Sequence, residues 1–93
     1  MMRHLILVKW AKPVPPSLLS EIEALFHQAL RLPGVESVRL SPACLTGEKR
    51  YDLLIEIKLQ EAAALAAFDR SPIHQQWKQR YSHLLAHKGI FDG

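Results

Sequence analysis

This sequence of 93 residues has little cysteine and no membrane-length apolar segment. The apolar run from Leu5 to Val8 is the length of a strand, whereas a helix that crosses a bilayer needs about 20 apolar residues. We therefore expect no membrane partner. The single cysteine, Cys44, excludes an internal disulfide and is typical of a protein from a reducing compartment. No charged region followed by a long apolar stretch opens the chain, so we expect no signal peptide and a cytoplasmic location.

The chain also has only a small excess of positive charge, because twelve Lys and Arg oppose nine Asp and Glu. The basic residues are scattered and cluster only at Lys49 and Arg50, whereas a nucleic-acid-binding surface needs a concentrated basic stripe. We expect no nucleic-acid partner. Phosphate-binding glycine loops and the GxSxG motif are missing, and no cofactor is expected. His83 and His87 lie four residues apart on an expected helix, but two ligands are too few for a metal site.

The composition, 48% hydrophobic and 23% charged, is that of an ordinary globular domain, and the length fits a single domain over residues 1–93. Periodicity predicts strands at 3–10, 35–41, 51–59 and 88–92 and helices at 18–32, 61–69 and 72–86. Ser17 and Ser71 are the expected N-caps of the first and last helices. The order β-α-β-β-α-α-β predicts an α+β, ferredoxin-like protomer with all helices on one face of an antiparallel sheet.

The faces of the expected sheet differ in what they bury. Alternation places His4, Ile6 and Val8 toward the helices. The opposite face carries four large apolar side chains: Leu5, Leu7, Leu54 and Phe91. An apolar patch of this size on an open sheet favours a second copy packed sheet to sheet, over a monomer with a wet amphipathic face. RNA-recognition modules share this element order, but they need exposed aromatic side chains on the central strands, which this face lacks.

Several segments, taken together in their order and spacing, resemble the stress-responsive A/B barrel (Dabb) family over nearly the whole chain. They are His4-Leu5-Ile6-Leu7-Val8-Lys9-Trp10, Leu32-Pro33-Gly34-Val35, Tyr51-Asp52-Leu53-Leu54-Ile55-Glu56-Ile57, Ser71-Pro72-Ile73-His74 and Ile90-Phe91-Asp92. The resemblance implies a ferredoxin-like protomer whose sheet pairs with that of a second copy to close a dimeric α+β barrel. Many members of this family have no assigned activity, and some plant members are linked to stress tolerance.

One plant member of the family is a cofactor-free cyclase of linear polyketides, and its pocket residues can be matched by position. The resemblance places its catalytic histidine at His74, a second pocket histidine at His4 and its catalytic tyrosine at Phe68. A phenyl ring has no hydroxyl with which to hold or protonate an enolate. The cyclase reaction is therefore not carried over to this chain.

His74 and His4 are the candidate catalytic residues. His74 lies in the first turn of the last helix, where the positive helix end favours a neutral imidazole that can act as a general base. Its structural alternative is a hydrogen bond that closes the helix start. His4 either lines a pocket or is a satisfied core histidine.

The expected ligand pocket lies between the helices and the sheet. Its walls would be Phe26, Tyr51, Ile55, Phe68, Trp77, Leu85 and Ile90. The same residues describe a filled hydrophobic core equally well. Two functions follow: a homodimer that binds a small apolar or aromatic ligand, or a cofactor-independent enzyme (a cyclase, isomerase or oxygenase) with His74 as base and His4 positioning the substrate. The sequence does not decide between them.

Overall fold

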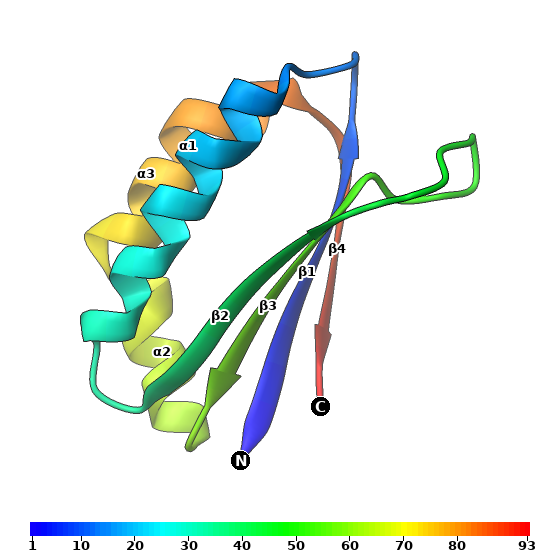
Figure 1. Cartoon of the computed structure of the whole chain (residues 1–93). Coiled ribbons are helices and arrows are strands. Elements are labelled where there is room, and N and C mark those ends of the chain that lie inside the picture. The colour runs from blue at the N-terminus through cyan, green and yellow to red at the C-terminus, as the bar shows by residue number, and fades with distance from the viewer.

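Four antiparallel strands form one sheet, and the helices pack on one of its faces (Figure 1). The computed structural model describes residues 1–93. Strands β1 (Met2–Trp10), β2 (Val35–Pro42), β3 (Leu53–Leu59) and β4 (Leu85–Asp92) lie in the order β2-β3-β1-β4. The other elements are α1 (Pro16–His27), η1 (Gln28–Arg31), α2 (Ala62–Asp69), α3 (Pro72–Tyr81) and η2 (Ser82–Leu84). This order confirms the predicted α+β architecture. None of the helices has the length and apolar content to span a membrane.

The starts of the helices follow different capping chemistry. At α3 the prediction is confirmed, because the Ser71 side chain accepts a hydrogen bond from the backbone N–H of His74. At α1 it is wrong: the helix starts at Pro16 and its extended N-cap residue is Pro15. A proline at the first helical position has its φ fixed near the helical value, and its missing N–H had no intrahelical partner to lose. The proline pair therefore sets the helix start and leaves Ser17 inside the first turn.

The last helix ends earlier than predicted, at Tyr81, and strand β4 begins at Leu85. Antiparallel pairing with β1 joins Trp10 to Leu85 and Lys9 to His87, so this segment gains ladder hydrogen bonds by leaving the helix. Tertiary pairing of this kind overrides local helical periodicity. His83 lies in η2 and His87 on β4, so the interpretation of the two as helical neighbours is wrong.

The open face of the sheet, the one away from the helices, carries the apolar patch that the sequence predicts. Leu5 is paired with Phe91 and Leu7 with Leu54, which places all four side chains on this face. The three leucines are half-buried, and Phe91 is 57% exposed. We call these four residues the open-face patch.

The β2–β3 loop (residues 43–52) extends beyond the open face, as Figure 1 shows in green. Lys9, which lies on that face next to Leu7, anchors the loop. Its Nζ atom donates hydrogen bonds to the carbonyl oxygens of Gly47, at 2.6 Å, and Arg50, at 2.9 Å. The loop therefore borders one end of the open-face patch.

Candidate functional site

His4 is held on β1 by an acidic partner at the other end of the chain. The residue is 6% exposed, and its Nδ1 atom lies 2.5 Å from Oδ1 of Asp92 on β4. A carboxylate only accepts, so Nδ1 carries the proton, and in the neutral ring the lone pair is on Nε2. The contact orients the imidazole and joins the C-terminal strand to β1.

His74 is positioned by the turn between α2 and α3. Its Nδ1 atom donates to the carbonyl oxygen of Asp69 at 3.0 Å. The Ser71 hydroxyl, which donates to the carbonyl of Phe68 at 2.6 Å, fixes the same turn. Since a carbonyl oxygen accepts only, the neutral His74 ring again carries its lone pair on Nε2. A lone pair on Nε2 is what general-base catalysis by this ring requires.

The structure brings His4 and His74 to one aromatic side chain. The Phe68 ring centroid lies 6.3 Å from that of His4 and 5.5 Å from that of His74. Phe68 has no exposed surface. The position that the resemblance matches to a catalytic tyrosine is therefore adjacent to both histidines and filled by a phenyl ring.

Four of the expected pocket walls pack against each other instead of enclosing a space. Phe26, Ile55 and Phe68 have no exposed surface and Trp77 is 2% exposed. The Phe26 ring centroid is 6.1 Å from that of Phe68 and 5.3 Å from that of Trp77, both ordinary aromatic contacts. The filled-core alternative describes these four residues.

Tyr51 and Ile90 lie apart from that cluster, so the prediction that they wall the same pocket is wrong. Tyr51 stacks on His87 at the open face, with ring centroids 5.9 Å apart. Strand β3 begins only at Leu53, so the alternation that would point Tyr51 toward the helices does not extend to it. Ile90 is on the helix-facing side of the edge strand β4, where it stays 50% exposed. Leu85 packs partly buried against the core from the start of β4.

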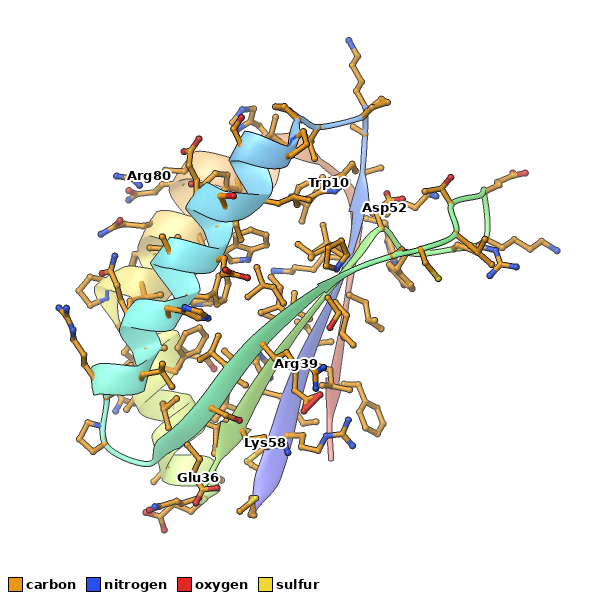
Figure 2. The ribbon with its side chains drawn as sticks, in the orientation of Figure 1. Trp10, Glu36, Arg39, Asp52, Lys58 and Arg80 are labelled. Atoms are coloured by element: carbon orange, nitrogen blue, oxygen red, sulfur yellow. The ribbon has the colours of Figure 1, made fainter.

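An open hollow does exist at the end of the sheet, where β1 leads into α1. It has a volume of about 420 Å³. Its lining comes from the end of β1, the β1–α1 connection, α1 and the β2–β3 loop: Lys9, Trp10, Ala11, Lys12, Pro13, Val14, Leu19, Pro42, Ala43, Thr46, Gly47 and Asp52. We call it the Trp10 hollow. Figure 2 shows Trp10 extending from β1 toward the helices, with Asp52 close by at the end of the sheet.

Local chemistry explains the shape of the Trp10 hollow. A register shift between Lys9 and Trp10 precedes the last pair of the β1–β4 ladder, Trp10 with Leu85, and the Asp52 carboxylate accepts a hydrogen bond from the backbone N–H of Trp10 at 2.8 Å. The prolines that follow, Pro13 among them, cannot continue a ladder, so the connection to α1 leaves the sheet. Sequence reasoning missed this site. Its signal was an aromatic residue at a strand end, followed by a proline-rich connection.

The Trp10 hollow is lined by both apolar and polar side chains. The indole of Trp10 and the side chains of Val14 and Leu19 provide apolar contact, while Lys12 and Asp52 provide a few polar groups. Its volume lies in the range of about 300–1,000 Å³ found for small-molecule sites, and five of its twelve lining residues are hydrophobic.

Several solved protein structures superpose on this chain over almost its whole length. A protein of unknown function from Jannaschia sp. CCS1, described as dimeric and ferredoxin-like, is 21% identical and superposes with a TM-score of 0.82 over 99% of this chain and 96% of its own. The chain has the ferredoxin-like fold. A Dabb family protein from Mesorhizobium loti is 13% identical, with a TM-score of 0.75 over 99% of this chain and 93% of its own.

A third similar structure is that of an enzyme. The hydroxynitrile lyase from Passiflora edulis is 10% identical and has a TM-score of 0.79, covering 99% of this chain and 90% of its own. No family model and no curated protein matches the sequence. At these identities the likeness establishes the ferredoxin-like fold, which hosts proteins with and without known activity.

Proposed function

We propose that this chain acts as a homodimer of the stress-responsive A/B barrel (Dabb) type, and that each protomer binds a small apolar or aromatic ligand in the Trp10 hollow. The observation that carries the proposal is the pair of sheet faces: one is covered by helices and ends in an open hollow, and the other is an uncovered apolar surface. The first face offers a ligand site, and the second offers an interface.

The open-face patch supports the homodimer. Its four large apolar side chains lie on one face of the sheet, which no helix of the same chain covers. Apolar area left in water opposes solubility, and a second sheet of the same kind is a self-complementary cover. Two of the similar proteins are described as dimeric and ferredoxin-like, from Jannaschia sp. CCS1 and Thermobifida fusca.

The interface is tested by placing charge in it. We expect the double variant Leu5→Lys and Leu7→Lys to run as a monomer in light scattering. Leu30→Lys is the control, because Leu30 is 46% exposed on η1, which lies on the helix side of the sheet. A double variant that keeps the mass of the unmodified protein would refute a sheet-to-sheet dimer.

Ligand binding is tested by tryptophan emission, because the chain has two tryptophans in different settings. Trp10 lines the hollow and Trp77 is 2% exposed in the core. We expect 2-phenylethanol, an uncharged aromatic probe, to change the emission of the unmodified protein, and Trp10→Phe to abolish the change. A response that survives in Trp10→Phe would show that the probe binds elsewhere.

Calorimetry with the same probe separates binding from the optical signal. Leu19→Gln removes apolar surface from the hollow, and we expect it to weaken binding about tenfold, since burying or losing such a side chain is worth about 1.5 kcal/mol or more. The control, Leu30→Gln, removes an exposed leucine outside the hollow. Equal weakening by both variants would refute the site.

A second candidate function, cofactor-independent proton abstraction, is favoured by the hydrogen bond from His74 to Asp69. That bond leaves Nε2 of His74 free to take a proton from an acidic C–H, giving an enolate and an imidazolium. The test is deuterium exchange into pentane-2,4-dione, an open-chain diketone, because Phe68 and Trp77 fill the space that a ring-sized substrate would need beside His74. We expect His74→Ala to reduce the exchange to the buffer rate and His83→Ala, which alters an exposed histidine of η2, to leave it unchanged. Exchange that His74→Ala does not affect removes His74 as the base.

A further inference from the structure

A second hollow lies on the open face, where the β2–β3 loop meets the end of β4. It has a volume of about 320 Å³. It is lined by Lys9, Glu48, Lys49, Arg50, Tyr51, Ala86 and His87. We call it the Tyr51 hollow. Only Lys9 is shared with the Trp10 hollow.

The charges around the Tyr51 hollow are unbalanced. Three cationic side chains, Lys9, Lys49 and Arg50, line it, against the single carboxylate of Glu48. The ion pairs of the chain join Arg3 to Glu56 and His4 to Asp92, so none of the three cations is paired. An anionic ligand therefore meets positive charge that no carboxylate of the chain neutralises at contact distance.

Lys9 fixes the position of that charge. It is half-buried on β1, and its ammonium group is held by two carbonyl oxygens, at 2.6 Å from Gly47 and 2.9 Å from Arg50. Both partners are neutral, and an ammonium has three donors. The third N–H and the whole positive charge stay available to a ligand oxygen. The guanidinium of Arg50 adds a planar fork that matches a carboxylate.

The rings of Tyr51 and His87 form an aromatic wall of the hollow that these cations also line. The rings of Tyr51 and His87 are stacked, with an interplanar angle of 29°. Gly89 makes this position possible, because a Cβ added there would lie 3.1 Å from the Tyr51 hydroxyl oxygen. Glycine inside a strand weakens the strand and marks a close approach. The approaching group here is the Tyr51 ring, which lies across β4 and forms the wall.

We propose that the Tyr51 hollow binds a small planar carboxylate, with the carboxylate at Lys9 and Arg50 and the ring against Tyr51 and His87. The volume falls at the lower end of the range for small-molecule pockets, which suits a single-ring acid. This site does not depend on the ligand site proposed at the Trp10 hollow. It lies beside Leu7 of the open-face patch, so it rests on the proposed homodimer leaving the hollow open at the loop end of the sheet.

The first test is a titration of the protein with benzoate, followed by the NMR signals of the Tyr51 and His87 rings. Benzamide has the same ring without the charge, and acetate has the charge without the ring. We expect benzoate to shift both rings and to bind at least about tenfold more tightly than either relative, because a hydrogen bond to a charged group is worth about 1.5–3 kcal/mol. Added salt should weaken benzoate binding and leave benzamide unchanged.

The second test uses a matched pair of charge variants. Arg50→Gln removes a cation of the hollow, while Lys88→Gln removes one from the adjacent strand position beside His87, on the opposite face of β4. We expect at least about a tenfold loss of benzoate affinity in Arg50→Gln and no change in Lys88→Gln. Far-ultraviolet circular dichroism confirms that both variants fold, and Tyr51→Leu removes the wall by a different route and should also weaken binding.

Three results would overturn the proposal. The first is that benzoate causes no ring shifts up to about 10 mM, a concentration at which even millimolar affinity is visible. The second is equal affinity for benzoate and benzamide, and the third is an equal loss of benzoate affinity in Arg50→Gln and Lys88→Gln. Titration of Trp10→Phe keeps this proposal separate from the previous one. That variant loses the 2-phenylethanol response if the Trp10 hollow is the neutral ligand's site, and it keeps benzoate binding.

Discussion

Two neighbouring residues of β4 offer a sharp test of which sheet face meets a partner. Phe91 and Ile90 are adjacent in sequence, on opposite faces of the strand, and similarly exposed, at 57% and 50%. Phe91 belongs to the open-face patch, and Ile90 faces the helix side. Substitution of each by lysine places the same charge at the same depth on the two faces.

The expected magnitude follows from the area of the Phe91 side chain. A phenylalanine presents about 200 Å² when extended, of which 57% is exposed here, so a covering sheet would remove about 110 Å² from water. At about 25 cal/mol per Å², this is worth about 3 kcal/mol in each protomer and about twice that in a symmetric dimer. Phe91→Lys is therefore expected to raise the dimer dissociation constant by about ten-thousandfold.

Analytical ultracentrifugation over a range of concentrations measures this effect. Phe91→Lys should sediment as a monomer at micromolar concentration, while Ile90→Lys should behave like the unmodified protein. If Ile90→Lys dissociates the dimer and Phe91→Lys does not, the interface lies on the helix side or at the strand edge, and the assignment of the open face is refuted.

Three further predictions concern close contacts inside the protomer. Gly34 has a φ of 82°, and a Cβ there would lie 2.7 Å from Cβ of Ala64. Gly34→Ala should therefore lower the free energy of unfolding, measured in urea, by about 2 kcal/mol. Adding Ala64→Gly should restore only the part of this loss that comes from the clash between the two Cβ atoms. Phe68→Ala should lower it by about 3–5 kcal/mol through the cavity it leaves, and a loss below about 1 kcal/mol would contradict a tightly packed core. Gly89→Ala should move the Tyr51 ring, and a double-mutant cycle with Tyr51→Phe should show coupling, whereas additive effects would contradict the contact.

The sheet and its faces could be predicted because their signals are local. Alternation along β1 and β3 is enough to separate Ile6 and Ile55, which are buried, from Leu5 and Leu54, which are not. The observed register pairs Ile6 with Ile55 and Leu7 with Leu54, so each face of the sheet keeps the side chains that alternation assigns to it. The Ser71 cap is local in the same way, since one side chain and a backbone N–H three residues later make it.

The remaining features depend on contacts between distant parts of the chain. The segment from Leu85 onward leaves the helix because β1 offers it a ladder, which periodicity within the segment does not reveal. Tyr51 turns to the open face because β3 starts after it and Gly89 leaves room for its ring. His4 and His74 do meet at Phe68, but whether a set of apolar side chains encloses a space or fills it depends on how their rotamers interlock. The Trp10 hollow forms where the β1–α1 connection meets the β2–β3 loop, and the sequence of neither loop alone predicts that they meet.

The account as a whole depends on the claim that the open-face patch is covered by a second copy of the chain. The most direct measurement is the molar mass of the unmodified protein in solution, by multi-angle light scattering at micromolar concentration. We predict about twice the protomer mass of 10.6 kDa. A mass equal to that of one protomer, with Leu5, Leu7 and Phe91 exchanging freely with solvent, would contradict it.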